Sequence, residues 1–276
     1  MCREMIINEL NKKGYNAVAK NKIENGVELE GILFFTDSNI SPIIYTESII
    51  ESAKKENKSL DEIVSEIIRI YETDKTLNFD VNTFFDKQYI LENIYIGLQK
   101  CSVEDIEKKP CFLDGIESYL YVRWEDGEKC CSVKVTEEIL NSANVTEFEA
   151  WEKAEINTNL ETEIESVVKV IAEMMEMELP EEMEQEVPMF VLTNKKKLRG
   201  ASAILNNKAL VEFGAKYHTK KLVVLPSSIH EMILIPYDEE MVEFELDELS
   251  QLVTMVNNTE VKATERLTDR AYILNI

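Results

Sequence analysis

The run KLVVLPSSIHEMILI, residues 221–235, sets the architecture of this chain. Residues 221–225 form a short apolar segment that predicts a strand, and residues 229–235 form another. Between them lies Pro226-Ser227-Ser228, whose residue types are typical of a turn. Two strands joined by so short a turn pair antiparallel, because a parallel connection needs a long crossover.

The flanking sequence extends this pattern into a small domain at residues 188–276. Residues 189–193 predict a strand, 194–199 a basic turn and 200–205 a returning strand. A helix is expected after Asn207, and a last long helix is expected to begin at Asp247. The order β-β-α-β-β-α contains hairpins rather than alternating strands and helices. It therefore predicts an α+β fold of mostly antiparallel sheets with packed helices.

The first 150 residues predict a second α+β region. Asn25-Gly26 between two β-prone runs is the strongest hairpin signal, because a type I′ turn needs positive φ at both positions. The other expected elements are a helix at 1–13, a helix near Thr46, a capping box at Ser59 and Glu62, a short helix from Asp80 burying Phe84 and Phe85, a helical turn at 103–106, a break at Pro110, a hairpin of 112–124 and 129–135 turned at Gly127, and helix starts at Thr136 and Thr146.

An acidic stretch joins the two regions. Residues 147–186 contain 14 Glu, two Lys and no Asp or Arg. We expect 151–187 to form an acidic helix followed by a solvated linker at 178–186, because like charges repel and extend a chain. The apolar face of the expected helix is Leu160, Ile164, Val167, Val168, Ile171, Met174 and Met175.

Composition excludes several classes of protein. The chain has 276 residues and a formal net charge of −23, so bulk charge does not favour nucleic acid or anionic membranes. Its longest uncharged stretch, residues 249–259, is too short and too polar to span a bilayer. Five cysteines without a Cys-x-x-Cys pair favour a reduced, cytoplasmic protein over a disulfide framework.

Motifs for cofactors and metals are missing. The sequence contains neither Gly-x-Gly-x-x-Gly nor Gly-Lys-Ser/Thr, the usual cradles for phosphate groups. Its two histidines, His218 and His230, do not have the spacing of a zinc site. We therefore predict no cofactor and no metal.

The segment Pro226-Ser227-Ser228-Ile229-His230-Glu231 is the one place where hydroxyls, an imidazole and a carboxylate converge. One interpretation is a hydrolase-like site with Ser227 or Ser228 as nucleophile and His230 as base. The sequence lacks the Gly-x-Ser-x-Gly elbow and any evident third group for it. The other interpretation, which we favour, is a structural or partner-contacting turn. Pro226, Ser227, Ser228, His230 and Glu231 are therefore the candidate recognition residues.

Three further clusters have ordinary interpretations. The basic run 195–199 predicts an exposed hairpin tip, although it could form a phosphate patch or pair with the acidic segment before it. Met174, Met175, Met177 and Met183 could form an adaptable binding surface, but we assign Met174 and Met175 to the core. Cys130 and Cys131 are expected to be strand thiols rather than redox groups.

The C-terminal third carries a family resemblance. Residues 188–195, Gly200-Ala201, 225–231 and 256–261 resemble an uncharacterised bacterial family of domains of unknown function. Residues 39–45 and 59–64 are similar too, so the resemblance covers most of the chain, less clearly from 101 to 186. Its most specific element is the string Pro-Ser-Ser-Ile-His-Glu. The resemblance supports the domain layout and implies no mechanism.

These observations favour a non-enzymatic protein-interaction or accessory module in the cytoplasm. The expected partner is another protein of basic character, because the chain is strongly acidic. The alternatives are the hydrolase-like enzyme and an inhibitor that mimics nucleic acid through its carboxylates. The sequence predicts no direct binding of nucleic acid or membrane, and it does not define an oligomeric state.

Overall fold

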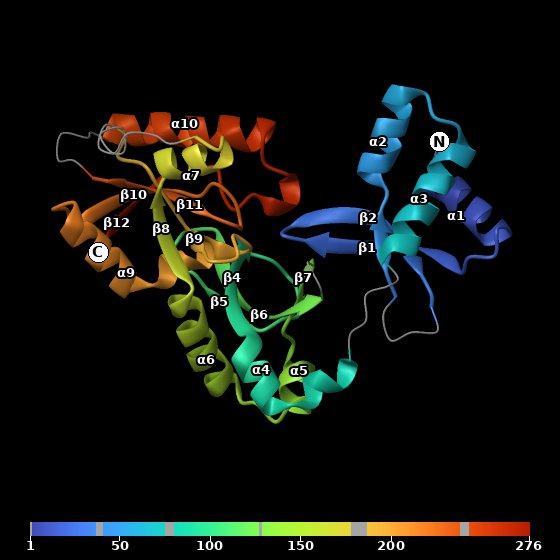
Figure 1. Cartoon of the computed structure of the whole chain (residues 1–276), viewed down its shortest axis with the longest axis horizontal. Helices are drawn as coiled ribbons and strands as arrows, with labels where there is room; N and C mark the ends of the chain where they lie inside the picture. Colours follow the sequence, from blue (N-terminus) through green and yellow to red (C-terminus); the bar gives the residue numbers. More distant parts are fainter. Residues whose placement is uncertain (1, 37–40, 75–79, 127–128, 178–186, 238–242) are drawn as a thin grey trace. The chain divides into compact units, whose positions relative to one another are not determined.

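A computed structural model describes residues 2–36, 41–74, 80–126, 129–177, 187–237 and 243–276 (Figure 1). The chain forms two compact units. The first comprises residues 1–83 and 126–129, and the second comprises 84–125 and 130–276. The domain boundaries near residues 150 and 187 stay predictions, because compactness does not test independent folding.

The first unit is an antiparallel three-stranded sheet with helices. Asn25 and Gly26 have φ of 49° and 76°, so the predicted hairpin turn is confirmed. Ser59 and Glu62 form the predicted capping box, in which the Ser59 N–H donates to Glu62 Oε2 at 2.8 Å. The elements are α1 (Arg3–Lys12), β1 (Ala17–Glu24), β2 (Val27–Phe34), β3 (Ile43–Tyr45), α2 (Glu47–Glu56) and α3 (Leu60–Asp74).

The second unit begins with a four-stranded sheet. One face of this sheet is apolar and packs against helices, with Ile94, Leu120 and Ala150 fully buried in their shared core. Thr136 and Thr146 cap the two predicted helices with their hydroxyls. The elements are η1 (Val81–Phe85, shared with the first unit), α4 (Lys87–Asn93), β4 (Ile94–Lys100), β5 (Lys108–Pro110), β6 (Ile116–Asp126), β7 (Lys129–Lys134), α5 (Glu137–Ser142) and α6 (Glu147–Leu160).

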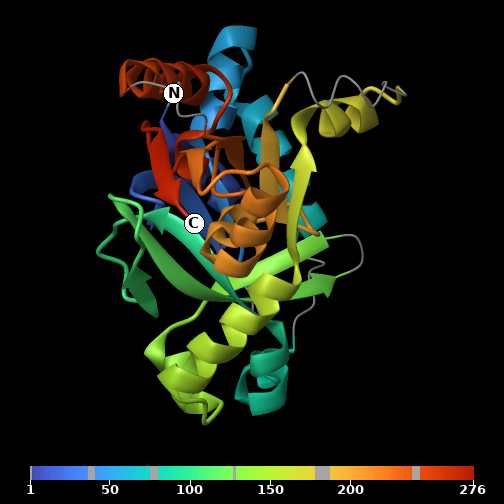
Figure 2. The ribbon, with the colours of Figure 1, turned by 90° about the vertical axis from the view of Figure 1, so that its left-hand side faces the viewer.

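A five-stranded antiparallel sheet completes the second unit, in the order β12-β10-β11-β9-β8. Figures 1 and 2 show α9 on one side of this sheet, with α7 and α10 on the other. The quoted run 221–235 supplies β10 and most of β11, which pair as predicted with Leu225 opposite Ile233. The elements are β8 (Thr162–Ser166), α7 (Val167–Met174), β9 (Phe190–Asn194), η2 (Gly200–Leu205), α9 (Asn207–Lys216), β10 (Lys221–Leu225), β11 (Met232–Pro236), α10 (Glu243–Thr259), η3 (Ala263–Glu265) and β12 (Tyr272–Asn275).

The α+β class with antiparallel sheets is confirmed, since every strand pair whose register is described runs antiparallel. Across the described ranges, none of the helices combines the length and apolarity that crossing a bilayer requires.

The expected strand at residues 200–205 is wrong, because this segment is the 3₁₀ helix η2. β11 and β8 occupy the two positions beside β9, so no edge is left for residues 200–205 to pair with. Gly200 also lies against the end of β9. A Cβ on it would come within 2.5 Å of the Asn194 backbone nitrogen.

The expected continuous helix across residues 160–175 is also wrong. It is interrupted by β8, which pairs with β9 and places Glu163 opposite Thr193. Met174 and Met175 are 80% and 62% exposed, so their assignment to the core was wrong as well. All five residues of β8 pair with β9 through the backbone, and this pairing outweighs their weak helical pattern.

Smaller differences concern single residues or short segments. Phe85 is 59% exposed rather than buried, and residues 103–106 contain no helical turn. The break predicted at Pro110 is confirmed, because the strand β5 ends there. α10 begins at Glu243, before the predicted cap at Asp247. The expected linker at 178–186, Met183 and the turn residue Gly127 lie outside the described residues.

Candidate functional site

The predicted recognition turn is held by its own hydrogen bonds. The Ser228 hydroxyl accepts from the His230 backbone N–H at 3.0 Å, and the Ser228 N–H donates to the Glu231 carbonyl at 3.1 Å. The Ser227 hydroxyl lies 3.5 Å from Glu231 Oε1. Ser228 is 9% exposed. These bonds stabilise a tight turn in the way that Ser side chains commonly do.

His230 ties this turn to its neighbours. Its Nδ1 accepts from the Arg199 backbone N–H at 3.1 Å, and its carbonyl accepts from the Thr193 hydroxyl at 2.8 Å. Burial is the largest influence on the imidazole and lowers its pKa, which favours the neutral form that accepts a hydrogen bond. Within the described residues neither serine hydroxyl bonds the imidazole, so the geometry offers no nucleophile–base pair.

Pro226 and Ser227 do border a hollow. It has a volume of about 130 Å³ and lies between the ends of β10 and β11 and the helix α10. Its wall is almost entirely apolar, and it comprises Met189, Leu225, Pro226, Ser227, Ile233, Leu252, Val253, Val256 and Asn257. The hollow is of a size to accept one apolar side chain. Two of the five predicted residues therefore lie at a surface feature, and the other three form the turn behind it.

The hollow belongs to the face of the five-stranded sheet that lies toward α10, which we call the outer face. Strand register places Leu225, Ile233, Val191 and Glu165 in one row across this face. The row is apolar over β10, β11 and β9 and ends in a carboxylate on β8. The alternate residues Leu222, Leu234 and Leu192 lie in the core on the α9 side.

Apolar side chains are exposed around the outer face. On α10, Leu252 and Met255 are 42% and 59% exposed. On α7 and just beyond it, Ile171, Met174, Met175 and Met177 are between 45% and 80% exposed. Scattered exposed apolar residues are ordinary, but several lie beside one apolar hollow here, which makes the outer face the first candidate site.

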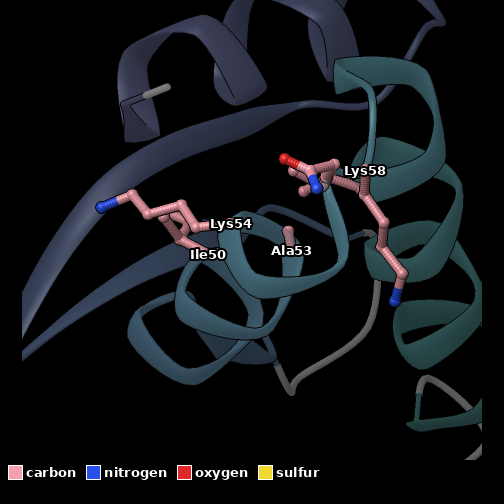
Figure 3. Close-up of a pocket in the computed structure, with 6 residues that line it drawn as sticks. Ile50, Ala53, Lys54 and Lys58 are labelled. Atoms are coloured by element: carbon pink, nitrogen blue, oxygen red, sulfur yellow. The ribbon is translucent and has the colours of Figure 1, made fainter.

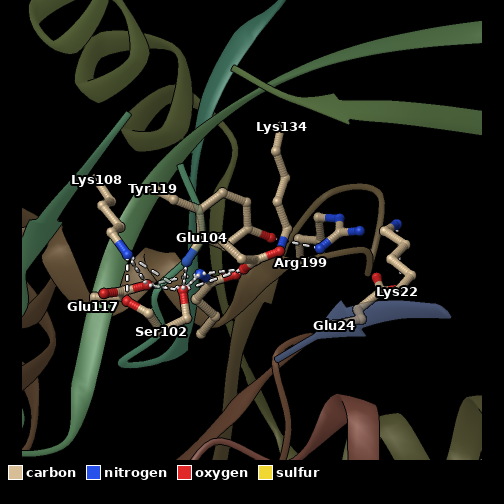
Figure 4. Close-up of polar contacts among 10 residues, drawn as sticks. Lys22, Glu24, Ser102, Glu104, Lys108, Glu117, Tyr119, Lys134 and Arg199 are labelled. Atoms are coloured by element: carbon tan, nitrogen blue, oxygen red, sulfur yellow. Dashed lines mark hydrogen bonds and ion pairs between the residues drawn. The ribbon is translucent and has the colours of Figure 1, made fainter. Parts of the chain in front are cut away.

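A second candidate is a polar network on the four-stranded sheet, which the sequence analysis missed (Figure 4). Lys134 Nζ donates to both Glu104 carboxylate oxygens at 2.8 Å and to Gln99 Oε1 at 2.7 Å. Glu117 accepts from Gln99 and Ser102, each at 2.8 Å. Although burial opposes it, these hydrogen bonds and the nearby Lys108 lower the pKa of Glu117.

The network continues along the same face of the sheet. Arg199 donates to the Tyr119 hydroxyl, and the Tyr119 ring lies across Gly97, where a Cβ would be 2.6 Å from its Cζ. Arg123 forms a bidentate pair with Glu161 at 2.6 and 3.0 Å. The charged groups are paired with one another, which is typical of a network that stabilises the fold. The sequence signal is the alternation Glu117, Tyr119, Tyr121 and Arg123 along β6. Tyr121 is buried on the same face of β6 as Tyr119.

The basic turn after β9 matches its expected exposure only in part. Lys195, Lys196 and Lys197 are exposed, and Lys196 pairs with Glu125. Arg199 is half-buried in the network instead. The turn leads into η2, so it is not the tip of a hairpin. The acidic residues 178–186, with which this turn could pair, lie outside the described residues.

Two other hollows have fewer features of a functional site. One in the first unit has a volume of about 300 Å³ and is bordered by Lys54 and Lys58, which point away from each other (Figure 3). Lys58 is bound to Glu56 and Glu66, at 2.9 and 3.1 Å. Another, of about 530 Å³, lies beside Glu107 and Glu137. In the part of the chain that is described, no three ligating side chains gather to hold a metal ion.

Fold and sites together define an acidic α+β protein in two compact units, with an apolar hollow on one sheet and an internal polar network on the other. The chain belongs to a family of unknown function, DUF5688, whose model matches residues 2–275. No curated protein and no solved structure matches it. The expected membership of a family of unknown function is therefore confirmed.

Proposed function

We propose that this chain is a non-enzymatic protein-interaction module that binds another protein through its outer face. The observation that carries the proposal is the apolar hollow beside Pro226 and Ser227, flanked by exposed side chains of α7 and α10. Flexible methionines are common at binding surfaces because they adapt to different partners.

The charge of the chain supports a protein partner of basic character. At −23, the chain attracts cations and repels nucleic acid and anionic membranes. A bacterial, cytoplasmic setting is part of the proposal. The family resemblance of residues 225–231 supports the bacterial source. The described residues include all five cysteines and contain no disulfide, which supports a reducing compartment.

The test is affinity capture from bacterial lysate with three forms of the chain. The outer-face variant is Met174→Ser with Met255→Ser. The matched control is Phe148→Ser, since Phe148 on α6 is 75% exposed and lies away from the outer face. We expect a protein that is recovered with wild type and control but reduced at least about tenfold with the double variant.

Equal recovery with all three forms would place the contact elsewhere and contradict the proposal. Recovery of no protein with wild type would contradict it too. Circular dichroism of each variant checks that it is folded, and all three positions are exposed, so little loss of stability is expected.

A further inference from the structure

Two stretches of sequence supply the residues that line the hollow and the helices beside it. Residues 222–261 comprise β10 after Lys221, the recognition turn, β11 and α10, and residues 170–194 include α7 after Lys169 and all of β9. Among the residues whose side chains are described, neither stretch contains Lys or Arg, and their acidic residues are Glu173, Glu176, Glu231, Asp247, Glu248 and Glu260. Within these two stretches, the described charges are therefore all negative.

Described carboxylates lie where they can meet a partner at this face. Asp247 and Glu248 are exposed on α10, one turn before Leu252 at the edge of the hollow. On the opposite side, Glu173 of α7 is 53% exposed. Lys169, the cation on α7, is held by Glu165 at 2.9 Å and lies 3.9 Å from Glu173. Among the described residues of α7 and α10, Lys169 is thus the one cation, and its charge is offset by these two carboxylates.

We infer that the occupant of the outer face is a basic amphipathic helix of another protein. This inference rests on the proposed function. An apolar stripe would meet Leu252, Met255 and the hollow, with one side chain inserted beside Pro226, while Lys and Arg on its flanks meet the carboxylates of α7 and α10. The two flanking elements are themselves helices on a sheet, which is the layer arrangement into which another helix packs.

Charge decides between this occupant and a second copy of the chain. Two copies facing each other through the outer face would bring the same acidic segments together, and each copy carries −23. A basic helix instead neutralises them. Recognition by this surface should therefore depend on salt, because exposed charges are screened over about 8 Å at physiological ionic strength.

The experiment uses three synthetic helical peptides of about 18 residues, long enough for five turns. They share one leucine stripe and carry Lys, Gln or Glu at all other positions. Fluorescence anisotropy measures their binding to the full chain. We expect the Lys peptide to bind at least about tenfold more tightly than the Gln peptide, and the Glu peptide not to bind.

Variants locate the contact. Leu252→Ser should lower the affinity for the Lys peptide about tenfold, because a partly buried leucine contact is lost. Asp247→Lys with Glu248→Lys should weaken binding of the Lys peptide and strengthen binding of the Glu peptide. Misfolding would not produce this reversal of preference. Phe148→Ser should leave all three affinities unchanged.

Equal binding of the Lys and Gln peptides, or binding that Leu252→Ser leaves unchanged, would overturn the inference. Absence of peptide binding would overturn it too. If lysate capture still depended on Met174 and Met255, the proposed function would stand without this occupant. If capture were also independent of them, both would fall.

Discussion

Replacing Lys134 by methionine should destabilise the second unit strongly. The side chain of Lys134 is 16% exposed, as is that of Glu104. Its ammonium group makes three hydrogen bonds shorter than 3 Å, two to Glu104 and one to Gln99. Methionine keeps a similar length and apolar stem but removes the charge, so it leaves the Glu104 carboxylate without its cation.

The magnitude follows from the degree of burial. Removing one partner of a fully buried ion pair lowers the free energy of unfolding by about 3–5 kcal/mol, whereas an exposed pair contributes about 0–1 kcal/mol. Glu104 retains the amide of Gln99 at 2.9 Å and the hydroxyl of Ser102 at 3.3 Å, so its loss is partly compensated. We therefore expect a loss of about 3 kcal/mol in the free energy of unfolding.

Urea unfolding followed by tryptophan fluorescence measures this loss. Both tryptophans, Trp124 and Trp151, lie in the second unit, so the signal reports that unit alone. With a urea dependence of about 2 kcal/mol per M, the midpoint should fall by about 1.5 M. Lys208→Met is the control, because Lys208 is 85% exposed and its nearest carboxylate is 3.9 Å away.

A loss below about 1 kcal/mol, or one equal to that of Lys208→Met, would refute the reasoning, because it would place the pair among exposed ones. The double variant Lys134→Met with Glu104→Leu should lose less stability than Lys134→Met alone, since no charge is then left unpaired.

The remaining predictions concern packing and pH, and all use the same fluorescence assay. Gly97→Ala should lower stability by about 1–3 kcal/mol, because its Cβ would displace the Tyr119 ring; an unchanged midpoint would contradict this contact. A hydrogen bond from Lys87 and the capping bonds lower the pKa of Glu149 from 4.5 to about 2. The Glu149 carboxylate therefore contributes to stability above pH 4.5, and this contribution is lost as pH falls toward 2. The difference in stability between wild type and Glu149→Gln should disappear over that range. Burial lowers the pKa of His230 from 6.5, so the unfolded state takes up the proton first and stability falls as pH decreases below 6.5. His230→Gln should flatten this dependence between about pH 7 and pH 5, and an equal slope in wild type and variant would contradict the burial of the imidazole.

Features that depend on neighbouring residues could be predicted from the sequence. The type I′ turn at Asn25-Gly26 needs only two residues that tolerate positive φ. The capping box at Ser59 needs only a hydroxyl and a Glu three residues later, and the helix start at Thr146 needs only a capping hydroxyl. The strands β10 and β11 follow from two apolar runs around a Pro-Ser-Ser turn. These local signals were sufficient for the α+β class.

The candidate site could be found only in part. Pro226 and Ser227 were identified because hydroxyls, an imidazole and a carboxylate converge in residues 226–231, and these two residues do border the hollow. The rest of its wall, including Met189, Leu252 and Val256, comes from segments that carry no special motif. Their meeting depends on the packing of α10 over β10 and β11, which periodicity within one segment does not encode.

By itself, the sequence determined the charge, the local turns and caps, and the class of fold, because each depends on composition or on residues a few positions apart. Only the tertiary structure decided that residues 162–166 form a strand, that residues 200–205 do not, and that Met174 is exposed. These outcomes depend on which strand occupies each side of β9. The polar network has the same origin, since Lys134, Glu104 and Arg199 meet only when strands and loops distant in sequence are brought together. Burial is a property of that assembly, and no single segment carries it.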